Sequence, residues 1–319
     1  MSVDTRTWYR HFASREAAGS SPTCERLAMA IADDDHLIGL LERLPDQKRQ
    51  PNLLFAACRH LGAPVGETEA ALEFLRARWG DVELVVRDRS TQTNEPARTA
   101  TFLPALAGLH QPIALVEIGA SAGLCLYPDA YRIRYDDAPV GPPASPVTID
   151  VTTTGNVPNP GPVDVVWRAG IDLNPLDVRD PDDLAWLEAC IWPEHDDRVD
   201  RLRAAASVVA ADPPQLVRGD LLDRLDDVLA AAPPDATVVV IHSAVLNYVD
   251  AARRRAVAAR LASDDLVWLS NEAPGVVTEL RAPVDAPEAG AHFVLGRNGA
   301  TTLAVSHPHG RWLWWAERR

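Results

Sequence analysis

The sequence lacks the cysteine pairs that define a disulfide framework or a structural zinc site. Its four cysteines, Cys24, Cys58, Cys125 and Cys190, lie far apart and form no C-x-x-C motif. Disulfide-rich scaffolds and zinc clusters both need cysteines at characteristic spacings. We therefore expect four small buried thiols in a protein from a reducing compartment.

Long hydrophobic segments are also missing. The first residues, Met1 to Arg6, mix charges and do not contain the apolar core of a signal peptide. No apolar run approaches the ~20 residues that are needed to cross a bilayer. These two absences predict a cytoplasmic protein that has no membrane as a partner.

Positive charge is scarce. Lys48 is the only lysine, and 31 Lys and Arg residues against 45 Asp and Glu residues give a net charge of −14. Such a surface repels a phosphate backbone and gains no affinity from counterion release. A nucleic acid is therefore disfavoured as a partner, and we expect the molecule on which the protein acts to be a small molecule or a protein. The Ala/Arg/Asp-rich usage is typical of a high-GC bacterial genome and has no functional meaning of its own.

The chain length and the hydrophobic pattern predict two regions. At ~150 residues per domain, 319 residues allow about two domains. From Thr5 to about Leu109 the apolar residues recur at helical spacing, with breaks beside Pro22, Pro45 and Pro64. We expect a helical N-terminal cap region over residues 1–110 and a second domain over residues 111–319.

Beyond residue 111 the pattern changes to short apolar runs that alternate with helical segments. The alternation predicts an α/β fold with a doubly wound, mostly parallel Rossmann-like sheet. The last two runs flank a Gly-rich turn at residues 296–299 and predict a C-terminal antiparallel hairpin. A Pro/Gly/Thr-rich stretch over about 137–168 predicts an inserted β-hairpin. The expected strands are Ile113–Ile118, Val165–Ile171, Gln215–Val217, Thr237–Ile241, Leu266–Leu269, His292–Leu295 and Thr302–Val305.

The most informative segment is a strand followed by a turn of small residues, Glu117-Ile118-Gly119-Ala120-Ser121-Ala122-Gly123, after which we expect a helix to start. Small residues let backbone amides and a following helix start approach a nucleotide-like ligand, and Glu117 can accept hydrogen bonds from an amine or a hydroxyl. A purely structural alternative is a tight strand-to-helix turn that needs glycine for packing. A second alternative is a serine hydrolase, because the turn matches G-x-S-x-G with Ser121 as nucleophile. That fold needs several strands before the serine, whereas the preceding residues look helical.

The same segment resembles the first motif of class I S-adenosylmethionine (SAM) methyltransferases, in which an acidic residue precedes the glycine turn. The resemblance rests on Glu117, Gly119, Ser121 and Gly123, and it implies that they bind SAM as the cofactor. Three later segments agree with it in order: Gly170–Pro175 with Asp172 for the ribose hydroxyls, Val217–Asp220 with Asp220 for the adenine, and Val239–Tyr248 for the strand and loop that face the methyl group.

Two aspartates compete for the ribose-binding position. The family's acidic residue follows the glycine turn by ~20 residues, and Asp136 lies at about that distance, at the end of Tyr131–Tyr135. Asp172 lies much farther along the chain. Either Asp136 binds the ribose and Asp172 ends a later strand, or the hairpin is inserted before the second strand and Asp172 binds the ribose.

Over nearly its whole length the chain also resembles an uncharacterised bacterial family of proteins with a domain of unknown function. That likeness brings an expected fold but no known activity. The segments that carry it are Tyr9–Phe12, Pro51–Phe55, Gln92–Glu95, Glu117–Leu124, Gly170–Val178, Trp192–His195, Ser270–Gly275 and His307–Gly310.

Polar residues after two strands are candidates for catalysis. In an open α/β sheet the ligand lies beyond the carboxyl ends of the strands, and His242, Asn271 and Glu272 occupy such positions. We expect His242 or Glu272 to act as a base where the acceptor must lose a proton, and Asn271 to contact the substrate. The alternative for His242 is a structural histidine whose nitrogens are both satisfied.

A polar cluster before Pro96 is the last candidate. Gln92, Asn94 and Glu95 can bind substrate or form a lid, or they can cap the helix that begins nearby. His307 and His309 have no third ligand at metal spacing, so we expect no metal site. Three functions remain open: a SAM-dependent methyltransferase, a serine hydrolase and a non-catalytic nucleotide-binding module. The sequence does not identify the acceptor or the oligomeric state.

Overall fold

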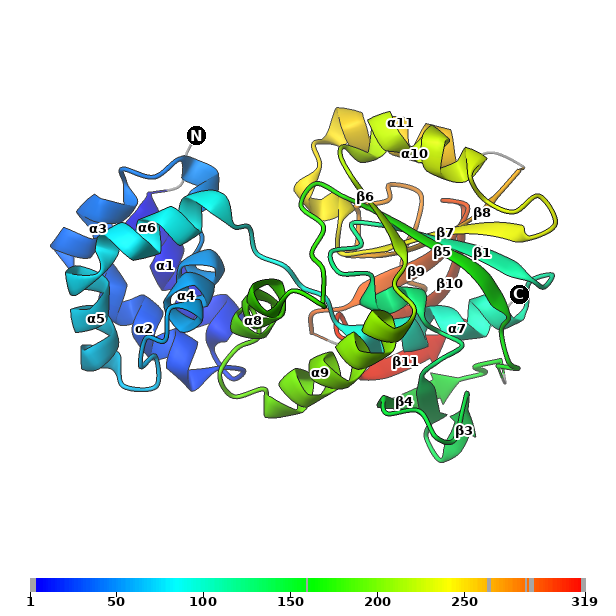
Figure 1. Cartoon of the computed structure of the whole chain (residues 1–319), viewed down its shortest axis with the longest axis horizontal. Coiled ribbons are helices and arrows are strands. Elements are labelled where there is room, and N and C mark those ends of the chain that lie inside the picture. Colours follow the sequence, from blue (N-terminus) through cyan, green and yellow to red (C-terminus); the bar gives the residue numbers. More distant parts are fainter. Residues whose placement is uncertain (1–3, 159, 263–264, 285, 287–289, 317–319) are drawn as a thin grey trace. The chain divides into compact units, whose positions relative to one another are not determined.

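The computed structural model describes residues 4–316 except residues 159, 263–264, 285 and 287–289 (Figure 1). The chain divides into two compact units. The helical unit comprises Met1–Thr93 and Arg179–Asp200, and the sheet unit comprises Asn94–Val178 and Arg201–Arg319. The division differs from the expected boundary near residue 110, because residues 94–110 pack with the sheet and residues 179–200 return to the helices.

The helical unit packs its amphipathic helices around aromatic side chains. Phe12 lies edge-on to both Phe55 and Trp192, with ring centroids 5.9 Å apart in each pair. Side chains of Asp4, Ser21 and Asp34 cap three helix starts by accepting backbone N–H groups. The elements are α1 (Thr5–His11), the π-helix η1 (Phe12–Ala17), α2 (Pro22–Ala32), α3 (Asp35–Leu41), η2 (Asp46–Lys48), α4 (Pro51–His60), α5 (Thr68–Ala77), α6 (Trp79–Asp88) and α8 (Pro181–Ala189).

The described part of the sheet unit builds a mixed, mostly parallel sheet of 11 strands in the order β3-β2-β4-β11-β10-β9-β8-β7-β1-β5-β6. The expected α/β class is confirmed, with an antiparallel C-terminal region from β8 to β11. The strands are β1 (Ile113–Ile118), β2 (Arg132–Tyr135), β3 (Ala138–Val140), β4 (Thr148–Gly155), β5 (Val165–Asp172), β6 (Gln215–Arg218), β7 (Thr237–Ser243), β8 (Val267–Glu272), β9 (Phe293–Arg297), β10 (Thr301–Ser306) and β11 (Trp312–Trp315).

Five parallel strands, β6-β5-β1-β7-β8, set the position of any site in this unit. In the sequence β1 comes first. In the sheet β5 and β6 lie on one side of β1, and β7 and β8 lie on the other side. The order therefore reverses between β1 and β7. In open α/β sheets the crevice at such a reversal, beyond the carboxyl ends of the strands, is where ligands bind.

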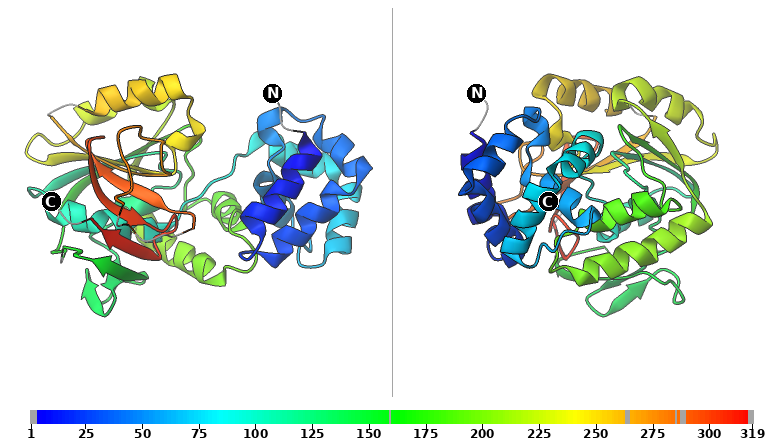
Figure 2. Two further views of the ribbon diagram at one scale, coloured as in Figure 1. Left: turned by 180° about the vertical axis from the view of Figure 1, so that it is seen from behind. Right: turned by 60° about the vertical axis from the view of Figure 1, so that its left-hand side comes forward.

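The pleat of the sheet divides the side chains between two faces. Val116, Val240 and Trp268 lie on the face that packs against α10 (Leu221–Ala230) and α11 (Ala251–Leu261), in one hydrophobic cluster. These two yellow helices cover one side of the sheet in both views of Figure 2. Glu117 alternates with Val116 and so points to the opposite face, on which α7 (Thr99–Ala107) lines a pocket with residues of β8 and β10.

The inserted segment is larger than the expected hairpin. It begins at Arg132, before the expected start, and forms β2, β3 and β4, with β2 parallel to β4. β4 then pairs in parallel with β11, so the insert extends the main sheet. Residues 312–315, which join it there, form the terminal strand. The remaining elements are η3 (Pro96–Arg98), η4 (Leu124–Leu126), η5 (Leu246–Tyr248) and α9 (Asp196–Ala211), which begins in the helical unit and ends in the sheet unit.

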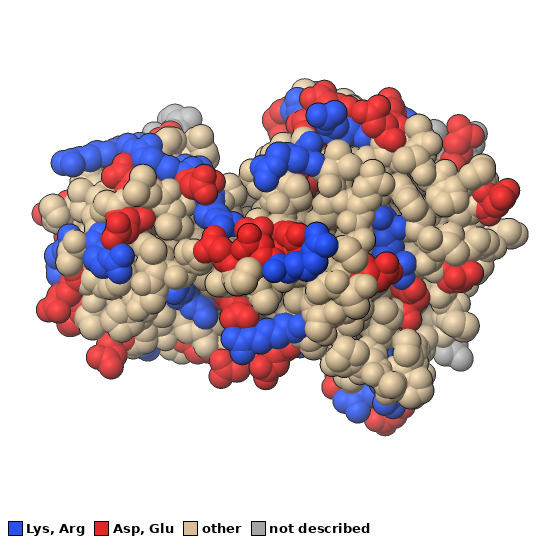
Figure 3. All heavy atoms as spheres, viewed as in Figure 1, with Lys and Arg blue, Asp and Glu red and all other residues tan. Residues whose placement is uncertain are grey.

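Three further features concern binding partners: the surface charge, the apolarity of the helices and the grouping of metal-ligating side chains. Acidic and basic side chains are mixed over the face shown in Figure 3. None of the helices in the described ranges is long and apolar enough to pass through a bilayer. Across those same ranges, no cluster of three or more His, Cys, Asp or Glu side chains is arranged to hold a metal ion.

Candidate functional site

Glu117 is a buried carboxyl at the carboxyl edge of the sheet, and its pKa is strongly raised. It lies at the end of β1 with only 6% of its surface exposed, and its Oε2 has no hydrogen-bond partner among the described residues. Burial raises the pKa of this carboxyl to about 8, although the positive charge of Arg98 and the thiol of Cys125 act in the opposite direction. An acid with this pKa is mostly protonated at neutral pH and can change its charge when a ligand arrives.

Buried groups from η3 and η4 surround Glu117. Arg98 is 6% exposed and donates hydrogen bonds to the carbonyls of Ser243 (3.2 Å) and Pro308 (2.9 Å). The Glu95 carboxylate accepts hydrogen bonds from the Ala97 N–H and from Arg201 Nε, each through Oε1. Glu95 therefore caps η3, as in the N-cap alternative, and also pairs with Arg201. A role of Glu95 in substrate binding or as a lid stays a prediction.

Asp172 supports the glycine turn. It ends β5, the neighbour of β1. Gly170 of β5 is paired with Glu117, and Asp172 follows Gly170 by two residues, so the side chains of Asp172 and Glu117 lie on the same face of the sheet. Its carboxylate accepts hydrogen bonds from the backbone N–H groups of Ser121 (2.9 Å) and Asn174 (2.7 Å). Asp172 and Glu117 are close enough that the aspartate contributes to the raised pKa of Glu117.

The structure separates the two aspartates that competed for the ribose position. Asp136 follows β2, in the inserted part of the sheet, and its carboxylate accepts hydrogen bonds from the backbone N–H and the hydroxyl of Thr153. The strand order places β2 seven strands away from β1. Asp136 is therefore not next to Glu117, and β2, β3 and β4 are inserted in the sequence between β1 and its neighbour β5. A ribose-binding role for Asp172 stays a prediction.

The glycine turn is tightly packed, and the expected helix does not follow it. A Cβ on Gly119 would lie 2.4 Å from Cγ2 of Val245, and a Cβ on Gly123 would lie 2.9 Å from Pro214 Cγ. Only the three-residue turn η4 (Leu124–Leu126) follows, so the expected helix start is wrong. Both glycines have positive φ angles. Packing and backbone conformation alone thus require glycine at these two positions.

Replacing Gly119 with alanine is expected to lower the free energy of unfolding by about 1–3 kcal/mol, because overpacking of that size accompanies an extra methyl group in a filled site. The left-handed backbone at φ +70° adds strain. Urea unfolding measures the change. Gly39→Ala is the matched control, since its added Cβ meets nothing within 4 Å in α3 and alanine favours a helix. Equal stabilities of the two variants would contradict the packing described.

Ser121 belongs to the same turn. Its φ is +52°, its side chain is 4% exposed, and its buried Oγ has no hydrogen-bond partner among the described residues. Asn94 reaches the turn from the start of the sheet unit, with Nδ2 3.4 Å from the carbonyl of Ala120. Ser121 Oγ is therefore a second buried polar atom without a partner among the described residues. The backbone N–H of the same residue donates to Asp172.

His242 and Glu272 form a fully buried chain of hydrogen bonds. Trp268 Nε1 donates to His242 Nε2 (2.8 Å), and His242 Nδ1 lies 2.7 Å from Glu272 Oε1. Glu272 Oε1 also accepts the backbone N–H groups of Val245 and Leu246. Both ring nitrogens of His242 thus have hydrogen-bond partners. The series of hydrogen bonds from Trp268 to Glu272 also holds the loop after β7 in place. These contacts match the structural alternative, and a catalytic role for His242 or Glu272 stays a prediction.

The pleat of the sheet explains why the hydrogen-bonded side chains of Trp268, His242 and Glu272 do not face Glu117. Glu117 is paired with Ile241, so His242, one residue later, points to the other face of the sheet. Asn271 shares the face of Glu117, but it is fully buried and bridges the hydroxyls of Ser243 and Ser306. Asn271 is thus part of the supporting structure beneath the strand ends.

The other predicted site residues lie at separate places. Asp220 caps α10 and forms an ion pair with Arg253. Gln92 belongs to the helical unit, where its backbone contacts the thiol of Cys190. Sequence reasoning missed Arg98, Cys125 and Arg201, because no motif marks them and only the fold brings them to Glu117 and Glu95.

Comparison with known proteins agrees with the likeness seen over the whole sequence. The model of one family, described as "Uncharacterized protein conserved in bacteria (DUF2332)", matches residues 6–315. No curated protein matches the chain. Since the matching model spans almost the full length, the chain belongs to the DUF2332 family.

Proposed function

We propose that the chain binds a SAM-type molecule at the carboxyl edge of the sheet and transfers its methyl group to a small-molecule or protein acceptor. The observation that carries the proposal is Glu117: a buried carboxyl with an unpartnered oxygen, at the end of the central strand and beside the order reversal of the sheet. A buried polar atom without a partner is costly and is characteristic of functional positions.

The polar atoms at this edge suit the ligand's polar end. The free Oε2 of Glu117 can accept a hydrogen bond from an ammonium group, and the free Oγ of Ser121 can donate to a carboxylate or a hydroxyl. The packed glycines give no separate support, because their Cβ directions are already filled. Asp172 supports the proposal by its place on the neighbouring strand, although two backbone N–H groups already use its carboxylate.

The protein's own residues have limited chemical tasks in this proposal. SAM supplies the electrophilic methyl group when it is bound. Glu117 anchors the ligand's amine, Asp172 fixes the turn through Ser121 N–H, and Arg98 fixes the end of β7 through the Ser243 carbonyl. Positioning of this kind and exclusion of water are the usual protein contributions to group transfer.

Calorimetric titration with SAM and with S-adenosylhomocysteine tests the proposal. We expect both to bind the wild type. We expect Glu117→Gln to bind at least about tenfold more weakly, because hydrogen bonds to charged groups contribute about 1.5–3 kcal/mol. Glu73→Gln, on the exposed face of α5, is the matched control and should bind like the wild type. Absence of binding by the wild type would refute the proposal.

Separate experiments test the two alternative functions, a serine hydrolase and a non-catalytic nucleotide-binding module. A serine hydrolase requires a base beside Ser121, but Ser121 Oγ has no hydrogen-bond partner among the described residues and both nitrogens of His242 are engaged elsewhere. Equal labelling of wild type and Ser121→Ala by an active-site serine probe would remove that alternative. Binding of SAM without methyl transfer across a broad acceptor panel would favour the non-catalytic binding module.

A further inference from the structure

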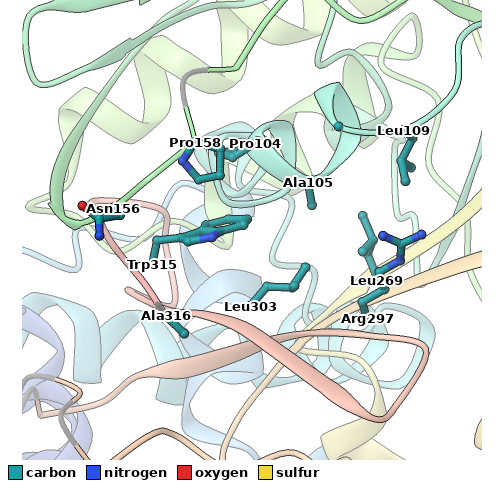
Figure 4. Close-up of a pocket in the computed structure, with 11 residues that line it drawn as sticks. Pro104, Ala105, Leu109, Asn156, Pro158, Leu269, Arg297, Leu303, Trp315 and Ala316 are labelled. Atoms are coloured by element: carbon teal, nitrogen blue, oxygen red, sulfur yellow. The ribbon is translucent and has the colours of Figure 1, made fainter. Parts of the chain in front are cut away.

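A pocket of about 570 Å³ lies on the α7 face of the sheet, under the end of α7. Its volume is within the ~300–1,000 Å³ of typical small-molecule sites. Figure 4 shows Pro104, Ala105 and Leu109 of the α7 segment across from Leu303 and Trp315. The walls are therefore largely apolar and come from α7 with the residues just after it, the four strands β8 to β11, and the segment after β4, all in the same unit.

The pocket has one cationic group in its wall. Arg297, at the end of β9, lies at one end of the pocket and Asn156 at the other (Figure 4). Arg297 is half-buried, and within the described ranges its guanidinium has no hydrogen bond or ion pair. The cost of a partly buried cation without a partner falls when an anion binds beside it.

This pocket is separate from the Glu117 site. Register pairs Glu117 with Ile241, Ile241 with Leu269, and Leu269 with Arg297, in one row on the same face of the sheet. Three steps between neighbouring strands make the distance between Glu117 and Arg297 about 14 Å at Cα. One small ligand therefore cannot place the same polar group at both residues.

We propose that this pocket is a binding site for a small molecule with an apolar body and a single carboxylate. The guanidinium of Arg297 matches a carboxylate in shape and charge, and the binding of that anion offsets the cost of a partly buried, unpaired cation. Pro104, Leu303 and Trp315 supply apolar area for the body of the ligand, and burial of apolar area there favours binding. The proposal is independent of the SAM site.

Octanoate and its neutral counterpart 1-octanol are the probes, and equilibrium binding to the full chain is the measurement. We expect octanoate to bind the wild type saturably and more tightly than 1-octanol. Arg297→Gln should weaken octanoate binding at least about tenfold without weakening 1-octanol, and Arg297→Lys should recover part of the loss. Arg311→Gln, an exposed arginine before β11, is the matched control and should leave binding unchanged.

A second variant tests the location without removing any charge. Ala105→Phe places a ring in the pocket, because half-buried Ala105 of α7 lines it, and should block both probes, while Glu117→Gln should affect neither. Circular dichroism checks that the Ala105→Phe variant is folded. No saturable binding of octanoate, equal binding of octanoate and 1-octanol, or full octanoate affinity in Arg297→Gln or in folded Ala105→Phe would each overturn the proposal.

Discussion

Replacing Glu117 with glutamine is expected to change how the stability of the protein depends on pH. Burial raises the pKa of Glu117 to about 8 in the folded state, whereas an unfolded glutamate titrates near ~4.3. Between these values the folded state holds the proton more tightly than the unfolded state, so this carboxyl stabilises the fold at low pH. That stabilisation is lost as the pH rises through the folded pKa. From pH 5 to pH 8 the loss is about 3–4 kcal/mol.

Urea unfolding at pH 5, 6.5 and 8 measures this effect as the difference between wild type and Glu117→Gln. The variant should gain stability relative to the wild type as the pH rises, because glutamine has no proton to lose. Glu73→Gln, an exposed replacement of the same kind, should run parallel to the wild type at all three pH values. If Glu117→Gln also runs parallel to the wild type, the buried environment assigned to Glu117 is wrong.

Glu272→Leu is expected to lower the free energy of unfolding by about 3–5 kcal/mol, because three buried donors lose their shared acceptor. The change removes the acceptor of three donors: His242 Nδ1 and the backbone N–H groups of Val245 and Leu246. Leucine has a similar volume but cannot accept a hydrogen bond, and each buried donor left unpaired costs about 1–3 kcal/mol.

Chemical denaturation of three variants separates this effect from the loss of a glutamate in general. Glu272→Gln keeps one carbonyl oxygen and should lose less than Glu272→Leu. Glu73→Leu, in an exposed position of α5, should stay within about 0.5 kcal/mol of the wild type. A Glu272→Leu protein as stable as Glu73→Leu would show that the buried chain from Trp268 to the loop after β7 does not support the fold.

The sequence predicted the central strands well, because buried parallel strands are continuous apolar runs. The expected Ile113–Ile118 coincides with β1. The expected Thr237–Ile241 stops short of β7, which continues through His242 and Ser243. Those two polar residues gave no strand signal, yet the sheet includes them because their side chains find partners inside it.

The relation between distant segments was not available from the sequence. The pairing of β4 with β11 joins residues 152–155 to residues 312–315, and neither run carries a signal for the other. The pleat that turns His242 away from Glu117 depends on the register between β1 and β7. Arg98 reaches the strand ends only because η3 packs there, so its role follows from tertiary structure alone.

The choice between Asp136 and Asp172 illustrates the same limit. Spacing favoured Asp136, since sequence distance measures nearness only when the second strand follows directly. The insert of β2, β3 and β4 breaks that assumption, and strand order places Asp172 beside β1. Glu117, in contrast, could be selected from the sequence, because it interrupts an apolar strand at its carboxyl end.

Proton release on ligand binding tests most directly whether an amine meets Glu117. Calorimetric titration of S-adenosylhomocysteine at pH 7, in two buffers with different ionisation enthalpies, counts the protons exchanged. With its pKa raised to about 8, Glu117 is mostly protonated at that pH, and an ammonium beside it favours the carboxylate. We expect the wild type to release close to one proton per bound ligand and Glu117→Gln to release almost none. Binding that fails to occur, or that releases equal numbers of protons in the two proteins, would contradict a SAM-type ligand at Glu117.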